Sequence, residues 1–442
     1  MSDVFCLTDP NGKLLDPAIQ ATVLAKYSRS PMSAKEILAG ITSEEADKFN
    51  DKWVIGYGHS SVAELATIPI CIEGLSIIAS KVVETVQRGA YSEKSTRYQR
   101  FSKESFVTPP GCSPTMKEFA GGLYVTYDKL HDPMVKRCAV LMGKDPTISD
   151  RVVNARAFDN LRYLLPAGTG TNVACVLNFR DARDLVSTLL GRSNPELKQL
   201  GEGILSAVSE VCPVLMRHAI PNMFEPRIKS LGIPNEQFDP TNPGWNVTMV
   251  GPPVYGGMDW TERNFEDLVK KCYGMDWASF SEHMDARPEH SEVPDLFKTV
   301  NITFDVMMDF GAFRDLQRHR RCEQLVEPLT TQYGYVVPDD ILNSELESEY
   351  RLAMESVLSY TDEVVNDQDL SQYVIPLGYL HRSFFQMTLK ELYYLVELRT
   401  RPQGHMSYRR VAYEIYELAK NRYPKLMKWC RACQPVFQGE HR

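Results

Sequence analysis

The segment at residues 314–324, RDLQRHRRCEQ, holds four arginines and one histidine within eight residues. It follows an apolar stretch, FDVMMDFGAF, so we expect the basic side chains to emerge at the edge of a packed core. At such an edge a cation meets a bound anion in a medium of low dielectric constant. Arginine suits this chemistry because its planar guanidinium binds phosphate through two parallel hydrogen bonds. The segment therefore predicts an anion-binding site, and the alternative is a solvated helix face.

A second polar segment, AYSEKSTRYQRF at residues 90–101, places Glu93, Ser95, Arg97 and Tyr98 within six residues. We interpret it as a second anion-binding loop, in which Ser95 and Arg97 hold a phosphate and Tyr98 packs beside a ring. The alternative is an exposed turn at the start of a helix, where Ser95 and Glu93 act as capping groups.

These polar segments belong to a pattern that occurs twice along the chain. GHSSVAEL at residues 58–65 returns as EHSEVPDL at residues 289–296. Each copy continues with an apolar stretch, TIPICIEGLSII or TVNITFDVMMDF, that predicts a strand running into a helix. Each helix is then expected to deliver a Gln-Arg pair, Gln87-Arg88 in the first copy and Gln317-Arg318 in the second.

Each copy also contains a later amphipathic segment, RDLVSTLLGR or LKELYYLVELR, that predicts a helix closing on Arg192 or Arg399. Either arginine could instead serve only to complement a helix dipole. Between the copies, Pro, Asn and Gly are frequent and cannot continue a helix or a central strand. We therefore predict two tandem α/β (α+β) units, residues 1–220 and 251–442, joined by a linker at 221–250 and packed as a pseudo-dimer.

The composition excludes several classes of function. With 49 Lys and Arg against 57 Asp and Glu, the formal net charge of −8 disfavours non-specific binding of nucleic acid. The ten cysteines do not form a pair of CxxC motifs, so we expect reduced thiols and no metal site. No stretch approaches the ~18 apolar residues of a membrane helix, so we expect a soluble, cytoplasmic protein. No GxGxxG, GxxxxGK[ST] or GxSxG motif occurs, so side chains must hold any phosphate.

Taken together, these residues resemble the flavin-dependent thymidylate synthase family, ThyX. GHSSVAEL is similar to the family's opening motif, SEKSTRY to its Ser-x-Arg loop, and QRHR to its Arg-His-Arg motif. RYLLPAGTGTN and LKELYYLVELRTRPQGHMSYRRVAYEIYELAKNRYP are similar to its later parts. The resemblance implies that each unit is an antiparallel or mixed sheet with flanking helices. It also implies a homodimer of this chain forming a pseudo-tetramer, because the family is tetrameric.

Each copy carries half of the family's motifs. The first copy reads Gln87-Arg88-Gly89 in place of Arg-His-Arg, and the second reads EQLVEPLTTQYGY where Glu-x-Ser-x-Arg-Tyr is expected. Arg162 precedes Leu-Pro in the first copy, whereas Gln372 stands before the corresponding Ile-Pro in the second. Because the family's nucleotide lies between subunits, the resemblance implies one composite site where SEKSTRY meets QRHR.

The resemblance implies methylation of dUMP to dTMP at C5, with FAD as cofactor and methylenetetrahydrofolate and NADPH as co-substrates. The residues implied to bind the substrate are Glu93, Ser95, Thr96, Arg97, Arg162, Arg318 and Arg399. Those implied to act in catalysis are Arg399, Arg318 and Arg192. Those implied to frame FAD are His59, Ser61, Glu93, Asn178, Arg180, Arg318, His319 and Arg320. Arg183 aligns with the same family position as Arg180.

Two other functions fit the same motifs. One is a flavin-dependent modification of another pyrimidine nucleotide, because the departures from the family's motifs leave the choice of substrate open. The other is a non-catalytic protein of the same fold with a structural or nucleotide-binding role, because halved motifs are expected of such a relative as well.

Overall fold

The computed structural model describes residues 9, 11, 13–28, 30–56, 60–97, 99–143, 148–222, 245–250, 254–255, 258–259, 262–289, 291–364 and 367–435. His59, Tyr98, His290 and residues 223–244 of the predicted linker lie outside these ranges. None of the helices within the ranges is long and apolar enough to cross a membrane.

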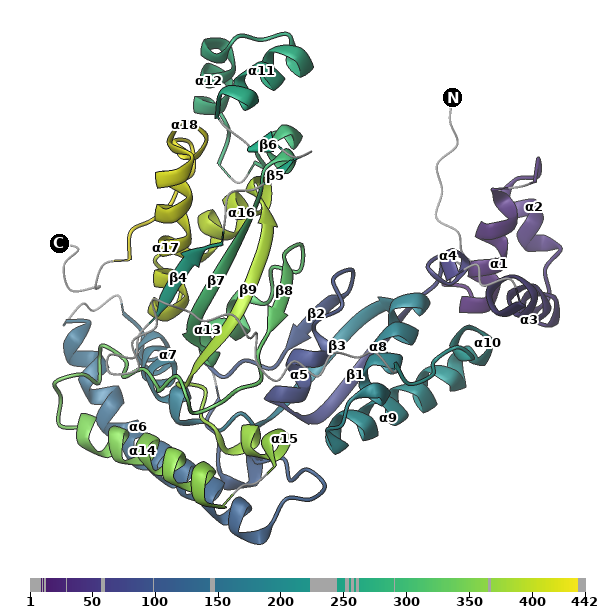
Figure 1. Ribbon diagram of the computed structural model, residues 1–442. Helices are drawn as coiled ribbons and strands as arrows, with labels where there is room; N and C mark the ends of the chain where they lie inside the picture. The colour runs from purple at the N-terminus through teal and green to yellow at the C-terminus, as the bar shows by residue number, and fades with distance from the viewer. Residues whose placement is uncertain are drawn as a thin grey trace. The chain divides into compact units, whose positions relative to one another are not determined.

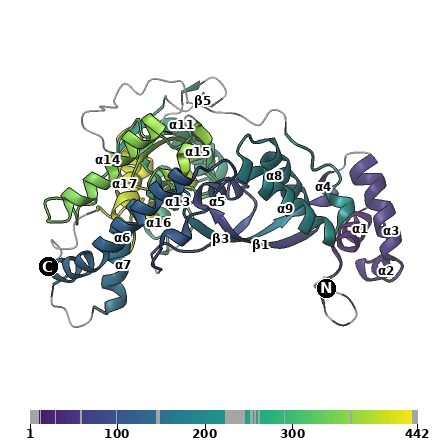
Figure 2. The same ribbon diagram turned by 90° about the horizontal axis from the view of Figure 1, so that it is seen from below.

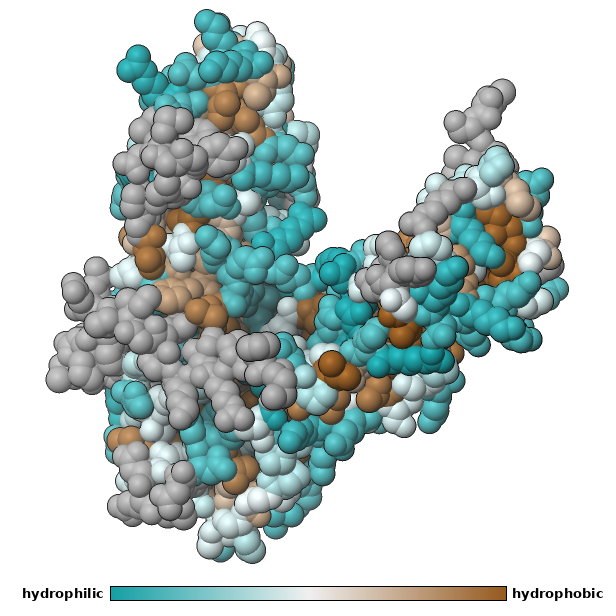
Figure 3. Space-filling view, turned by 45° about the vertical axis from the view of Figure 1, so that its right-hand side comes forward, coloured by the Kyte–Doolittle hydropathy of each residue, from teal (hydrophilic) through white to brown (hydrophobic). Residues whose placement is uncertain are grey.

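The chain divides into two compact units. The first consists of Met1–Lys94, Val107–Cys112 and Gly170–Arg227, and the second of Ser95–Phe106, Ser113–Thr169 and Ile228–Arg442. Among the described residues visible in Figure 3, hydrophilic side chains predominate, with smaller hydrophobic patches among them.

The first unit is built on a three-stranded antiparallel sheet in the order β1-β3-β2. Its strands are β1 (Thr67–Ser76), β3 (Gly170–Asn178) and β2 (Ala90–Glu93). Buried and exposed residues alternate along β3, and the buried ones, such as Val173 and Leu177, face a shared core with α8 and α9. These two helices lie along one face of the sheet (Figures 1 and 2). The helices of this unit are α1 (Pro17–Tyr27), α2 (Ala34–Ala39), α3 (Ser43–Asn50), α4 (Ser60–Ala63), α5 (Ile77–Val83), α8 (Phe179–Gly191), α9 (Pro195–Val211) and α10 (Pro213–Met216), with a π-helical turn at Asp51–Gly56.

The second unit is built on a four-stranded antiparallel sheet in the order β4-β7-β9-β8. Its strands are β4 (Asn246–Met249), β7 (Asn301–Asp309), β9 (Leu380–Thr388) and β8 (Glu323–Val326). Most residues of β7 and β9 are buried, because helices such as α16 and α17 pack on these strands (Figure 1). The helices are α6 (Pro114–Leu141), α7 (Asp150–Leu161), α11 (Glu262–Tyr273), α12 (Trp277–Asp285), α13 (Phe310–Leu316), α14 (Glu347–Val364), α15 (Gln368–Ser371), α16 (Leu389–Arg399), α17 (Met406–Arg422) and α18 (Pro424–Met427). Short elements complete the unit: 3₁₀ turns at Lys103–Ser105, Arg162–Leu164, Asp295–Thr299 and Gln372–Val374, and the strands β5 (Val254–Tyr255) and β6 (Met258–Asp259).

The expected repetition of the topology is confirmed. The series β1-α5-β2 and 3₁₀-β3-α8 in the first copy returns as β7-α13-β8 and 3₁₀-β9-α16 in the second. Both strand-to-helix changes in each copy occur at a capping side chain. Ser76 accepts a hydrogen bond from the Ala79 amide at 3.0 Å, and Asp309 accepts one from the Ala312 amide at 2.7 Å. The sequence thus specifies the same turn twice through local capping.

One detail of the predicted repeat is wrong. The segment from the end of α5 at Val83 to the start of β2 at Ala90 equals in length the segment from Leu316 to Glu323. This alignment places Arg88 opposite Arg321, not opposite Arg318 as predicted. Arg318 is closer in sequence to the end of α13 than Arg88 is to the end of α5, so the two Gln-Arg pairs are not equivalent.

The compact units do not follow the two sequence copies. Residues 95–106 and 113–169 come from the first copy but belong to the second unit. They pack there because Phe119 of α6 stacks on Tyr360 of α14 at 4.0 Å, and the amides of Ala167 and Gly168 bond to carbonyls of the second copy. The predicted linker also ends early, because its residues 246–249 form β4 and pair with β7.

Burial of His381 in the sheet of the second unit predicts a dependence of stability on pH. Its ring packs against Phe310 and Phe313, and its Nε2 donates to the Glu327 carbonyl oxygen at 2.8 Å. Burial lowers the pKa of His381 to about 4, from 6.5, so the unfolded chain binds a proton more readily between these values. We expect the free energy of unfolding to fall by about 3 kcal/mol through this group as the pH drops from 6.5 to 4.

Chemical denaturation at several pH values would measure this effect. The variant His381→Asn should show a flatter loss of stability across the same window, whereas His218→Asn, which alters an exposed histidine, should keep the slope of the unaltered chain. An unchanged slope in His381→Asn would contradict the prediction.

Candidate functional site

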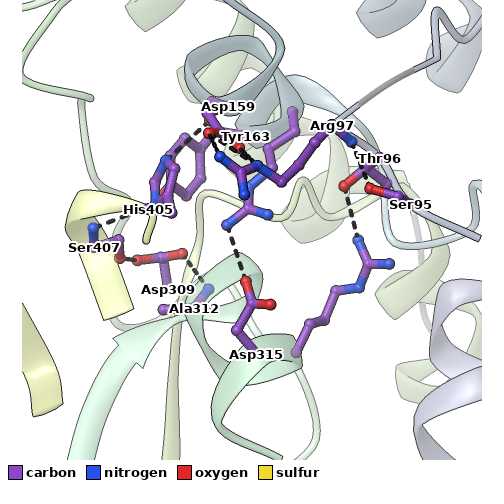
Figure 4. A network of polar contacts seen from close by, with 12 residues as sticks. Ser95, Thr96, Arg97, Asp159, Tyr163, Asp309, Ala312, Asp315, His405 and Ser407 are labelled. Carbon is purple, nitrogen blue, oxygen red and sulfur yellow. Dashed lines mark hydrogen bonds and ion pairs between the residues drawn. The ribbon is translucent and has the colours of Figure 1, made fainter. Parts of the chain in front are cut away.

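Three segments of the second unit bring their basic and polar side chains together. They are Ser95–Arg97, which follows β2 in the chain, the start of the 3₁₀ turn at Arg162, and the end of α13 with the residues that follow it. Arg314 of α13 is buried and donates from Nη1 to the Thr96 hydroxyl at 3.5 Å (Figure 4). Arg162, also buried, donates from Nη2 to Asp315 Oδ2 at 3.5 Å. Thr96 of SEKSTRY and Arg314 of RDLQRHRR therefore meet within one unit, and the composite site at this place stays a prediction.

Asp159 of α7 holds one edge of the Arg97 guanidinium. Nε of Arg97 lies 2.8 Å from Oδ1 of Asp159, and Nη2 lies 2.7 Å from Oδ2, so the pair is bidentate (Figure 4). Arg97 makes no hydrogen bond through Nη1 with any residue that the structure describes. Burial raises the pKa of Asp159, although Arg162 and Arg97 act in the opposite direction. The pair thus fixes the arginine in place and leaves one of its donors for a ligand.

His405 supports the same pair from the start of α17. Its Nε2 donates to the backbone oxygen of Asp159 at 3.1 Å, and its Nδ1 accepts from the Ser407 amide at 3.2 Å (Figure 4). Burial lowers the pKa of His405 well below its ordinary value, so the ring is neutral at physiological pH. The neutral ring, which carries its proton on Nε2, thus links the start of α17 to α7.

Asp315 lies among four arginines. Its carboxylate is 3.5 Å from Arg162 and 3.9 Å from Arg318. Burial acts to raise the pKa of Asp315, but Arg162, Arg318, Arg399 and Arg314 outweigh it and hold the pKa below its ordinary value. Asp315 is therefore ionised at neutral pH and accepts hydrogen bonds without donating any.

A buried histidine orients Arg399, the last residue of α16. His319 Nδ1 lies 3.2 Å from Glu391 Oε1, and its Nε2 accepts from Arg399 Nε at 2.9 Å. Burial lowers the pKa of His319, so a neutral ring that donates to Glu391 and accepts from Arg399 fits both contacts. The Arg399 guanidinium also lies 5.7 Å from the centre of the Tyr408 ring. Both contacts restrict where this cation points.

Five arginines of this region form what we call the arginine cluster, Arg97, Arg162, Arg314, Arg318 and Arg399. Among the described residues, Asp159 and Asp315 face the cluster at the distances given above, and Asp309 also attracts Arg162. Because the arginines outnumber these carboxylates, the local charge is positive. An anion with two or more charges would be attracted to it.

A cavity of ≈ 550 Å³ has Arg97 and Asp159 in its wall, and the other four arginines of the cluster do not line it. Its walls include Arg97, Asp159, Tyr163, Trp245, His405 and Ser407. Trp245 is held in the wall by a hydrogen bond from its Nε1 to Asp309 at 2.9 Å. The volume is within the range of small-molecule sites, about 300 to 1,000 Å³.

The residues predicted to form the site are distributed over both units. The second unit contains Ser95, Thr96, Arg97, Arg162, Arg318, His319, Arg320 and Arg399, and the first contains Ser61, Glu93, Asn178, Arg180 and Arg192. In the first unit Asn178 caps α8, and Glu93 forms a buried ion pair with Lys81 at 3.0 Å. Arg180 pairs with Glu64, and Arg192 is the C-terminal capping residue of α8.

Sequence reasoning missed the acidic and neutral partners of the cations. Asp159 and Asp315 face arginines directly, while Glu391 and His405 act through His319 and Asp159, and none of the four stands out by type or spacing. Asp315 lies inside the quoted segment RDLQRHRRCEQ, one residue after Arg314, and was available as a signal there.

Comparison with known proteins gives relatives of two lengths. A UPF0159 protein of Chlamydia pneumoniae is 28% identical over 93% of this chain and 88% of its own length, and a UPF0159 protein of Thermoplasma acidophilum is 24% identical over 87% and 88%. A flavin-dependent thymidylate synthase of Geobacter sulfurreducens is 26% identical over 47% of this chain and 83% of its own length. A crystal structure of a UMP/dUMP methylase from Streptomyces cacaoi bound with 5-Br UMP matches 44% of this chain and 98% of its own, with 15% identity and a TM-score of 0.34.

The family model described as thymidylate synthase complementing protein matches two segments, residues 14–214 and 261–425. The two segments correspond to the two copies read from the sequence and together span most of the chain. The family resemblance is thereby confirmed, and the chain belongs to the thymidylate synthase complementing protein family.

Proposed function

We propose that the chain binds a pyrimidine nucleoside monophosphate, with dUMP as the candidate substrate, and methylates it at C5. The observation that carries the proposal is the arginine cluster of the second unit, where donors from three separate segments surround a region of net positive charge. A nucleoside monophosphate brings a dianionic phosphate and a ring rich in acceptor atoms, and both groups match arginine.

Within the cluster, the proposal assigns Ser95, Arg97 and Arg162 to the phosphate and the sugar side of the nucleotide. Arg97 offers Nη1, because Asp159 engages only its Nε and Nη2. Arg162 offers Nε, which is buried and has no hydrogen-bond partner among the described residues. A buried guanidinium nitrogen without a partner is costly, so a ligand oxygen at this place would stabilise the site.

The proposal assigns Arg318 and Arg399 to the pyrimidine ring. A guanidinium only donates hydrogen bonds, so it fits the carbonyl oxygens of uracil and its deprotonated N3. A fixed positive charge beside N3 also lowers the pKa of that nitrogen, and the deprotonated ring is more electron-rich. Arg399 suits this task because His319 and Tyr408 restrict its position.

The proposed chemistry needs no protein nucleophile. Cys322 lies within the basic segment, but burial raises the pKa of its thiol well above the ordinary value, so it stays protonated. When bound, reduced FAD would supply the hydride, with methylenetetrahydrofolate as the carbon donor and NADPH as the reductant. The residues of the first unit assigned to FAD are Ser61, Glu93, Asn178 and Arg180.

In the first unit, Arg180 fits an anionic group of the flavin diphosphate better than Arg183 does. Both lie in the first turns of α8, where the helix dipole favours anions. Nε of Arg180 makes no hydrogen bond with a described residue, although it lies 3.9 Å from Asp184 Oδ2. Arg183 instead uses Nε and Nη2 on Asp184 and Nη1 on Ser60. Nε of Arg180 can therefore still donate a hydrogen bond, whereas Nε of Arg183 already donates to Asp184.

Removing Arg97 should weaken binding of dUMP by about 2–5 kcal/mol, because the phosphate would lose a buried charged partner. Arg318→Ala should also weaken the binding of dUMP. The matched controls are Arg100→Ala and Arg321→Ala, because each alters an exposed arginine of an ion pair near the residue tested. Isothermal titration of dUMP into the purified chain would measure all four variants.

Arg97→Ala also leaves the buried Asp159 without its partner and can destabilise the fold. The double variant Arg97→Ala/Asp159→Asn removes both charges, so it should keep the melting temperature closer to that of the unaltered chain and still bind dUMP weakly. Equal affinities for dUMP in the tested and the control variants would show that the cluster does not hold the nucleotide.

The purified protein should be yellow, or should become yellow when FAD is added. We expect Arg180→Ala to raise the dissociation constant of FAD about tenfold or more, the loss of a charge-assisted hydrogen bond, while Arg183→Ala changes it little. Flavin absorbance after gel filtration and titration of FAD would measure this. A colourless chain that takes up no FAD would instead support the non-catalytic alternative.

A further inference from the structure

Asp315 differs from Asp159 and Asp340, two other carboxylates of the second unit that pair with arginine. Its nearest guanidinium nitrogens are 3.5 Å away in Arg162 and 3.9 Å away in Arg318. By contrast, Asp159 and Asp340 each accept hydrogen bonds of 2.7 Å from their arginines. The Asp315 side chain is only 17% exposed, so water reaches little of it. Four cations attract this carboxylate, but none binds it at the usual distance.

An ionised carboxylate of this kind has unused capacity as an acceptor. Charge-assisted hydrogen bonds between nitrogen and carboxylate oxygen are normally about 2.7–2.9 Å long, and a carboxylate offers roughly four lone-pair sites. A charged acceptor that is shielded from water and lacks close donors is unfavourable. The arrangement is therefore complete only when a further donor reaches Asp315, and the cluster is where a ligand is proposed to lie.

The position of Asp315 narrows the identity of that donor, provided that the proposed function holds. On one side it faces Arg162, assigned to the phosphate and sugar side, and on the other Arg318, assigned to the pyrimidine. The edge of the pyrimidine ring thus faces guanidiniums, which only donate hydrogen bonds and match the acceptors of uracil. Between the phosphate and the base of a nucleotide, the groups that donate hydrogen bonds are the hydroxyls of the sugar.

We propose that Asp315 accepts a hydrogen bond from a sugar hydroxyl of the bound nucleotide and determines how the site recognises the sugar. A carboxylate is the usual partner of a ribose hydroxyl in nucleotide sites because it is a strong acceptor. The exocyclic amine of cytosine is another donor that a carboxylate can bind. It fits this site less well, because the amine would face guanidiniums that also donate.

Titration of four nucleotides into the full-length, FAD-loaded chain tests the proposal. The probes are UMP, dUMP, 2′,3′-dideoxyuridine monophosphate and dCMP. We expect the unaltered chain to bind the dideoxy compound about 10- to 100-fold more weakly than the better of UMP and dUMP, the loss expected for a hydrogen bond to a charged group. Whether UMP or dUMP binds better distinguishes the 2′ from the 3′ hydroxyl as the donor.

In Asp315→Ala this discrimination should fall to within about twofold, because the acceptor is gone. The test compares the ratio of dissociation constants of two nucleotides within one variant. Removing a carboxylate from the cluster should strengthen binding of every phosphate-bearing ligand alike, so it leaves that ratio unchanged. Asp315→Asn keeps the shape and a neutral acceptor, so it should show an intermediate ratio and serves if the alanine variant fails to fold. Asp128→Ala, which removes an exposed partner of Arg100, should keep the full discrimination.

Two results would overturn the inference while leaving the proposed function intact. One is an unchanged preference for the hydroxylated nucleotides in Asp315→Ala and Asp315→Asn. The other is a change confined to the ratio between dCMP and dUMP, which would make Asp315 a reader of the base. If the unaltered chain binds none of the four nucleotides, the proposed function fails and this inference fails with it.

Discussion

The charge balance of the arginine cluster is the constraint on which the core of the second unit depends. Guanidiniums held close together in a medium of low dielectric constant repel one another, so carboxylates must face them for the arrangement to persist. Asp159 meets this need through its bidentate contact with Arg97, and Asp315 meets it by lying among the other four arginines. Since these two carboxylates leave part of the positive charge unbalanced, the same constraint that shapes the fold creates the attraction for an anionic ligand.

Asp309 connects the elements that maintain this balance. It ends β7, caps α13 through the Ala312 amide at 2.7 Å, and accepts hydrogen bonds from Trp245 and from Ser407 at the start of α17 (Figure 4). Arg314 and Asp315 follow on α13, so the direction in which they leave the sheet depends on this cap. His405, the N-terminal capping residue of α17, contacts the backbone of Asp159. A continuous series of polar contacts therefore runs from the end of the sheet to the partner of Arg97.

The strands, their helices and the meeting of two basic segments were predictable from sequence because apolar periodicity, capping residues and arginine-rich motifs are local signals. The counter-ions were not, because Asp159 and Glu391 reach their partners only through tertiary packing. The register between Arg88 and Arg318 also failed, since a dipeptide match carries less information than the lengths of the elements around it. The predicted boundary at residue 220 reflects the repeat, whereas packing of Phe119 on Tyr360 reflects contacts that no local pattern encodes.

The same alignment of elements shows how the first copy differs from the second at the position of the cluster. Lys81 of α5 stands where the second copy has Arg314. It is buried and lies 2.6 Å from Glu84 and 3.0 Å from Glu93, so two carboxylates already engage this cation. Arg88 is likewise paired with Glu64 and Asp181. A phosphate would have to displace carboxylates that belong to the chain itself. Each displaced carboxylate would stay buried without its partner, which costs free energy. The halved motifs of the first copy thus correspond to ion pairs that stabilise the first unit. In the second unit, by contrast, the carboxylate of Asp315 lies 3.5 Å or more from the guanidiniums of Arg162 and Arg318.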